Sequence, residues 1–113
     1  MIKNLGAKKL SRTGSHRRAM FSNMATSLLL HEKVQTTLVK AKALTGIIDK
    51  IITDAKNGKH MEVRRVIKDK AVYKKLFEVI VPRYKERSCG CSRVLKLGQR
   101  KGDATEIALV KLV

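Results

Sequence analysis

The sequence is poor in acidic and aromatic residues. Of its 113 residues, 26 are Lys or Arg and only 9 are Asp or Glu, so the formal net charge is +17. Trp is absent and aromatic side chains that stack on bases are scarce. A charge this large exceeds what solubility requires of a small domain, and its self-repulsion implies a polyanionic partner. Nucleic acid is the leading candidate, and an anionic membrane surface is the second.

Long apolar runs and targeting signals are also missing. Leu28–Leu30 is a short patch inside an amphipathic pattern, whereas a membrane-spanning helix needs about twenty apolar residues. Residues 1–24 contain no acid and superficially suit a transit peptide. However, the segment has its own helix cap and continues into the expected core. We therefore expect a cytoplasmic protein without a membrane partner.

Residue types that carry catalysis or bind metals are too few or too scattered to form a recognisable site. Cys89 and Cys91 offer at most two ligands, and the three His residues lie far apart in the sequence. His31-Glu32 opens a zinc-protease pattern, but Gln35 stands where the second His is needed. No phosphate-binding glycine loop, nucleophile elbow or magnesium-binding carboxylate cluster occurs. We therefore expect no enzyme, no metal, no cofactor and no small-molecule substrate.

A helix is predicted to begin at Ser15, whose hydroxyl can cap the amides of the first turn. Behind it, Phe21, Met24 and Leu28 recur at three- and four-residue spacing, so one face of the helix can be buried. We expect the rest of the chain to pack against this helix.

Three cationic or titratable residues, His16, Arg17 and Arg18, occupy the start of this helix, and Arg12 lies just before it. A helix N-terminus is already partially positive and favours acids. The arrangement therefore costs stability in the isolated protein unless an anion binds between the amides and the side chains. On this segment alone, a phosphate site and simply solvated arginines remain about equally good interpretations.

The remaining segments alternate between strand and helix patterns. Two basic regions lack periodicity: an N-terminal arm, residues 1–14, and a second region, residues 83–93. After the first helix we predict a strand over 33–37 and a helix that begins at 38 and stops at Asn57-Gly58. A short helix over 59–70 follows, and then a helix that is capped by Asp69 and ended by Pro82. The last two elements are strands over 94–97 and 107–112, which a basic hairpin loop, 98–103, joins.

This order indicates an α+β fold, a two-layer single domain over residues 15–113 with helices packed on a small sheet of about three strands. Basic residues gather in the arm, at the first helix start, in residues 83–93 and at the hairpin tip, and they form one continuous face if these regions converge. No module that recognises a specific nucleotide sequence is apparent, so we expect the partner to be recognised through its phosphates and its shape. Structured RNA and nonspecific duplex DNA, as for a nucleoid-type protein, both fit.

Two blocks of residues resemble one known family. The first is LSRTGSHRRAM at residues 10–20, and the second comprises SRVLKLG at residues 92–98 and RKGDA at residues 100–104. Between them lie Asn23-Met24, Ser27-Leu28, His31-Glu32, Thr36-Thr37 and Lys40-Ala41-Lys42. In order and spacing these residues closely resemble the bacterial large-subunit ribosomal protein L17 family. Residues 57–81 match the family only in pattern.

The resemblance implies a structural protein of the large ribosomal subunit, without catalytic activity. It implies binding to large-subunit ribosomal RNA near the polypeptide exit, beside neighbouring ribosomal proteins. Carried over by position, the expected RNA contacts are Lys3, Lys8, Lys9, Arg12, Ser15, His16, Arg17, Arg18, Arg93, Lys96, Arg100 and Lys101.

Overall fold

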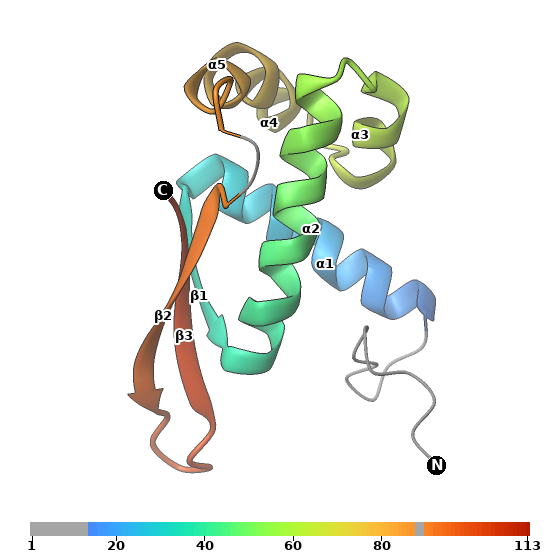
Figure 1. The fold of residues 1–113 in the computed structure, drawn as a ribbon. Coiled ribbons are helices and arrows are strands. Elements are labelled where there is room, and N and C mark those ends of the chain that lie inside the picture. Colours follow the sequence, from blue (N-terminus) through green and yellow to red (C-terminus); the bar gives the residue numbers. More distant parts are fainter. Residues whose placement is uncertain (1–13, 88–89) are drawn as a thin grey trace, which may run out of the picture.

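The computed structural model of the protein describes residues 14–87 and 90–113. Helices pack on one face of a three-stranded antiparallel sheet, and the order of elements along the chain is the predicted one (Figure 1). The α+β expectation is therefore confirmed. The N-terminal arm, residues 1–14, lies outside the described residues except for Gly14.

The first helix, α1 (Gly14–His31), crosses behind the longer helix α2 (Figure 1). Its predicted apolar stripe is confirmed, since Phe21, Ala25 and Leu28 are buried. Because α1 begins at Gly14, Ser15 lies inside the first turn, and the prediction that it precedes the helix as its cap was wrong by position. The helix ends where Glu32 takes a left-handed conformation, with φ of 65°, and its amide donates to the Leu28 carbonyl.

The second helix, α2 (Leu38–Lys56), follows β1 (Lys33–Thr37) directly and forms the centre of the helical layer. Its apolar residues recur at helical spacing, and the buried ones are Leu38, Ala41, Leu44, Ile48, Ile51, Ile52 and Ala55. The predicted stop is confirmed, because Asn57 is the C-cap and Gly58 adopts a φ of 74°, which favours glycine.

Three short helical segments cover the end of α2: α3 (His60–Val66), α4 (Lys70–Lys75) and α5 (Val81–Arg83). The Asp69 carboxylate caps α4, as predicted, by accepting from the amides of Ala71 at 2.8 Å and Val72 at 3.2 Å. The prediction that Pro82 ends this helix was wrong. The chain passes through a π-helical turn, η1 (Leu76–Ile80), and stays helical to Arg83. The wider turn before Pro82 accommodates a residue that lacks an amide proton.

The sheet has the order β1-β3-β2, with β2 (Ser92–Gln99) and β3 (Glu106–Leu112) joined by a hairpin. Val34, Val110 and Val94 face one another in register on the side that carries the helices, and we call this side the inner face. Both predicted C-terminal strands are confirmed, with β2 extending further in each direction than expected. The register of β2 shifts at Lys96/Gly98.

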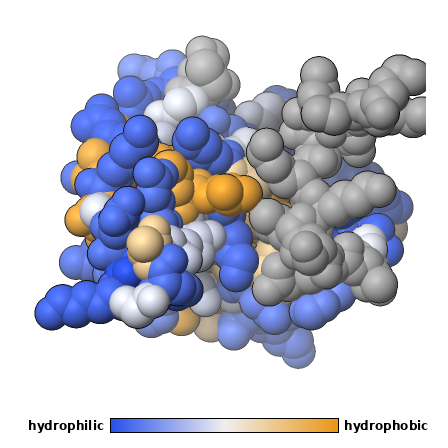
Figure 2. All heavy atoms as spheres, turned by 90° about the horizontal axis from the view of Figure 1, so that it is seen from below, coloured by the Kyte–Doolittle hydropathy of each residue, from blue (hydrophilic) through white to orange (hydrophobic). Residues whose placement is uncertain are grey.

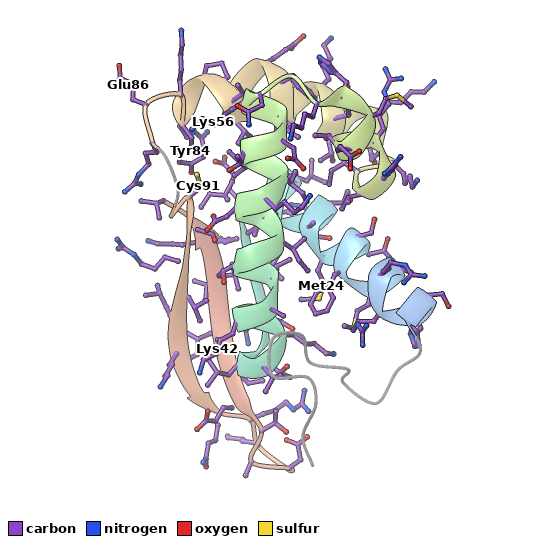
Figure 3. All side chains as sticks on the ribbon, turned by 45° about the vertical axis from the view of Figure 1, so that its right-hand side comes forward. Met24, Lys42, Lys56, Tyr84, Glu86 and Cys91 are labelled. Atoms are coloured by element: carbon purple, nitrogen blue, oxygen red, sulfur yellow. The ribbon has the colours of Figure 1, made fainter. Side chains whose placement is uncertain are left out.

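Polar contacts fix the junction between helices and sheet. Tyr84 is buried, and its hydroxyl donates to the Val113 carbonyl at 2.6 Å. Burial raises the pKa of this phenol, so it stays protonated and remains a donor. Cys91 is also buried directly beside Tyr84 (Figure 3), and its amide donates to the Asp49 carboxylate at 3.2 Å. The start of β2 is thereby tied to both α2 and the last helical turn.

Candidate nucleic-acid interface

The start of α1 carries the predicted cluster of cations and no acid in its first turn. Ser15, His16 and Arg18 are exposed, whereas Arg17 is half-buried. The Arg18 guanidinium folds back over the first turn, with Nη1 3.3 Å from the position that a Cβ on Gly14 would take. Positive side chains therefore lie over the positive end of the helix dipole, where an anion offsets their repulsion.

A hollow of about 880 Å³ opens beside this cluster, between α1, α2 and α3. Its floor is apolar and includes Phe21, Ile47 and Val66. Its rim carries five cations, Arg17, Arg18, Lys42, Lys50 and Arg65. The face seen from below has hydrophobic atoms at its centre and mostly hydrophilic residues around them (Figure 2).

Three members of this rim, Lys42, Lys50 and Arg65, were not among the predicted contacts. Helical periodicity separates the two lysines from the buried stripe of α2, but it does not tell which helix lies opposite them. Lys42 belongs to the first half of α2 (Figure 3). Two rim cations are partly neutralised, since Lys50 pairs with Asp54 at 3.2 Å and Arg65 with Glu62 at 3.3 Å.

The second predicted group, Arg93, Lys96, Arg100 and Lys101, lies on β2 and at the hairpin tip, and all four side chains are exposed. Arg100 is already engaged, because its guanidinium donates to the two Asp103 oxygens at 3.2 and 2.5 Å. Hydrogen bonds from Arg100 and from the Thr105 amide hold the pKa of Asp103 well below its usual range. The hairpin tip therefore has Lys101 as its more available cation.

A row of three cations crosses the sheet on the side opposite the helices, which we call the outer face. The register pairs Lys33 with Lys111 and Lys111 with Arg93, so the three side chains lie next to one another on adjacent strands. Among the described positions of this face there is no acid. Like charges placed directly opposite one another are destabilising unless something neutralises them. Of this row, only Arg93 was predicted from the sequence as an RNA contact.

The predicted contacts therefore form two groups within residues 14–87 and 90–113. One surrounds the start of α1 and the other lies on the sheet and hairpin, with the first half of α2 between them (Figure 1). Within the described residues these groups form two basic surfaces, and the continuous face expected if all basic regions converge also includes the arm, which lies outside them. Arg83 belongs to neither, since it is paired with Glu32. Lys3, Lys8, Lys9 and Arg12 lie outside the described residues.

The described part of the chain offers little for other chemistries. No three His, Cys, Asp or Glu side chains gather there as they do around a metal ion. In the same residues, no helix combines the length and the hydrophobicity that crossing a membrane requires.

Comparison with known proteins gives a consistent result. The sequence model of a family described as Ribosomal protein L17 matches residues 20–113. The chain is 53% identical over 113 residues to the large ribosomal subunit protein bL17 of Elusimicrobium minutum, covering 100% of this chain and 99% of that protein. The protein of the same name from Endomicrobium trichonymphae is 46% identical over 116 residues, covering 100% and 99%. That from Halothermothrix orenii is 49% identical over 109 residues, covering 94% and 96%. The chain therefore belongs to the ribosomal protein L17 family, whose members are structural proteins of the large ribosomal subunit.

Proposed function

We propose that this protein binds and stabilises folded large-subunit ribosomal RNA near the polypeptide exit of the cytoplasmic ribosome, beside neighbouring ribosomal proteins. The observation that carries the proposal is the start of α1, where His16, Arg17 and Arg18 lie over a positive helix end without an acid in the first turn. Relatives that are named large ribosomal subunit proteins support this assignment over a nucleoid-type DNA-binding role.

The chemistry is neutralisation of closely packed phosphates. A phosphate at the start of α1 accepts hydrogen bonds from backbone amides of the first turn and from the guanidinium groups around it. Further phosphates are held on the sheet and hairpin, by Arg93 on the outer face and by Lys96 and Lys101 nearer the hairpin tip. Because the start of α1 and the β2–β3 hairpin lie on either side of the first half of α2 (Figure 1), the protein contacts RNA segments at two places and holds them together.

Salt dependence of binding tests this proposal directly. If roughly eight phosphates are contacted, log affinity for a folded large-subunit RNA fragment falls with log salt at a slope of about −6 to −7. Affinity for a duplex DNA of equal length is expected to be lower. A slope near −2, or equal affinity for the DNA, would show that the basic surfaces do not act together on RNA.

Arg17→Glu tests the α1 site by itself. The change places an acid near the positive end of the helix, so the free protein keeps its thermal stability or gains slightly. RNA binding weakens, and the salt slope becomes shallower by about 1. The matched control is Lys74→Glu, an equal charge change at an exposed position on α4. Helix α4 lies near the C-terminal end of α1, since Lys75 Nζ of α4 donates to the Leu30 carbonyl of α1. An equal loss in both variants would mean that only net charge matters.

The position near the polypeptide exit is tested in assembled subunits. A photoreactive group at position 101, on the exposed hairpin tip, is expected to cross-link to large-subunit RNA or proteins that border the exit. Cross-links exclusively to the face that contacts the small subunit would contradict this placement.

A further inference from the structure

Three rings that are separated in the sequence lie together, one each from α3, α4 and η1. The His60 ring stacks on Phe77, with centroids 4.5 Å apart and an interplanar angle of 22°. Tyr73 packs against Phe77 at 4.8 Å and 47°. We call His60, Tyr73 and Phe77 the ring cluster. None of its three members is among the RNA contacts expected from the sequence.

The members of the ring cluster hold one another in fixed orientations. His60 Nδ1 and the Tyr73 hydroxyl are 2.7 Å apart and share a hydrogen bond. The Arg64 guanidinium lies over the Tyr73 ring, 5.3 Å from its centroid. Since His60 and Arg64 are four residues apart on α3, both occupy the same side of this helix. A binding partner thus meets rings that are already ordered, which lowers the entropic cost of stacking on them.

His60 is exposed, although Tyr73 and Phe77 are half-buried. A hollow of about 500 Å³ lies beside His60, and Met61, Lys50 and Lys59 also line it. Met61 is 74% exposed, so an apolar, polarisable side chain faces solvent next to the imidazole ring. Contacts with His60 and Tyr73 contribute to the partial burial of Phe77, but they do not explain why a ring and a methionine remain open to solvent.

The charges around the ring cluster favour an anionic partner. Of the acids that line the hollow beside His60, Asp54 is paired with Lys50 and Glu62 with Arg65, and Asp69 nearby caps α4, so these three acids are engaged within the protein. Lys59 and Arg64 are exposed beside the rings. Arg65 continues this surface to the hollow at the start of α1. A nucleic acid strand held at α1 can therefore reach the ring cluster across α3.

We propose that the ring cluster is a stacking site for an unpaired RNA base, which lies on the exposed His60 ring while Lys59 and Arg64 contact the flanking phosphates. The inference rests on the proposed RNA-binding function and adds a contact to a base where that function requires only phosphates. Aromatic rings bind unstacked bases in this way, and such stacking tolerates any base because each has a π-face. The site thus favours a loop or bulge over a continuous duplex.

The test separates base stacking from phosphate binding. The full chain is titrated with a single-stranded uridine oligoribonucleotide of about twelve residues and with an abasic ribose-phosphate strand of equal length. The natural sequence is expected to bind the uridine strand about tenfold more tightly. His60→Ala removes this preference and leaves affinity for the abasic strand unchanged. His60→Phe keeps a ring and therefore keeps the preference. His31→Ala, at another exposed histidine, is the matched control and retains it.

Tyrosine fluorescence provides a second readout that does not depend on any variant. The chain has no Trp and two Tyr residues, of which Tyr84 is buried. The uridine strand is expected to quench the emission of Tyr73, whereas the abasic strand leaves it unchanged. Equal affinity for the two strands without quenching, or an equal loss on both strands in His60→Ala, would overturn the stacking site. If the salt-dependent binding of ribosomal RNA persists in that case, only this inference fails, and the proposed function stands.

Discussion

The two faces of the sheet are built from the same three strands but are explained by different causes. On the inner face, Val34, Val110 and Val94 lie in one row beneath the helices, and Val110 is completely buried. One residue further along β3, on the outer face, Lys33, Lys111 and Arg93 form a row of like charges. Folding alone accounts for the first row and opposes the second.

The contrast shows where to look for function in this protein. Apolar residues that the fold requires are matched by their neighbours within the chain. Cations that the fold does not require, and that even repel one another, need a partner outside the chain. Replacing single residues in the two rows is therefore a direct way to separate structural from binding residues.

The largest loss of stability is expected from a substitution on the inner face. Val110→Glu buries a carboxylate against aliphatic residues without a partner, which costs more than about 4 kcal/mol and abolishes cooperative unfolding. Lys111→Glu introduces the same residue one position away, on the outer face, and that variant stays folded. Thermal unfolding monitored by circular dichroism compares the two. Similar stability of both variants would contradict the assignment of the faces.

An intermediate effect on stability is expected at Glu32, an acid that balances two cations. Glu32 pairs with Arg83 and with Lys75, the latter at 3.6 Å. The hydrogen bond from Arg83 and the charges of Arg83 and Lys75 lower the pKa of Glu32 below its ordinary value of 4.5. Because the Glu32 and Arg83 side chains are more than a third exposed, solvent screens their attraction, and Glu32→Gln costs only about 0.5–1 kcal/mol at neutral pH.

The sign of the pH dependence follows from the direction of this shift. A lowered pKa in the folded state means that Glu32 stabilises the protein above pH 4.5 and that this contribution is lost as the pH falls through the folded pKa. The stability difference between the natural chain and Glu32→Gln is therefore expected to shrink in acid. Glu86→Gln is the control, since Glu86 points away from the domain (Figure 3). A difference that persists unchanged at low pH would assign the effect to something other than the charge.

The smallest effect on stability, and the clearest on binding, is expected from Lys111→Glu. The new carboxylate lies between Lys33 and Arg93, so the free protein gains about 0.2–1 kcal/mol. Affinity for folded ribosomal RNA decreases because the same change removes a cation from the outer face. Calorimetry and an RNA titration on one preparation measure both quantities. If stability rises and RNA affinity stays constant, the outer row faces solvent in the complex.

Local periodicity was sufficient to predict most of the fold. The buried stripe of α2, the start of β1 and the cap at Asp69 each depend on residues within a few positions of one another. Pro82 was misjudged because the π-helical turn that accommodates it leaves no pattern in the sequence. The engagement of Arg100 by Asp103 had a visible signal, since the two residues are three positions apart in one loop.

The candidate site was less predictable because it depends on how distant elements meet. The start of α1 was predicted from adjacent residues, but Lys42 and Arg65 join it only through the packing of α2 and α3. The pairing of Lys33 with Lys111 requires the strand register, which joins residues far apart in the chain. His60, Tyr73 and Phe77 look unremarkable as separate residues, and their stacking exists only in the folded protein.

The position of β3 in the centre of the sheet also determines when the protein can fold during its own synthesis. β1 is made early, yet its pairing partner is the last strand in the sequence, and the two edge strands are not paired with each other. Helices α1 and α2 can dock while translation continues, but the sheet cannot assemble until residues 106–112 have left the ribosome. A growing chain therefore exposes Val34 and Val94 until β3 has emerged, and the outer row of cations is assembled only when β3 joins the sheet.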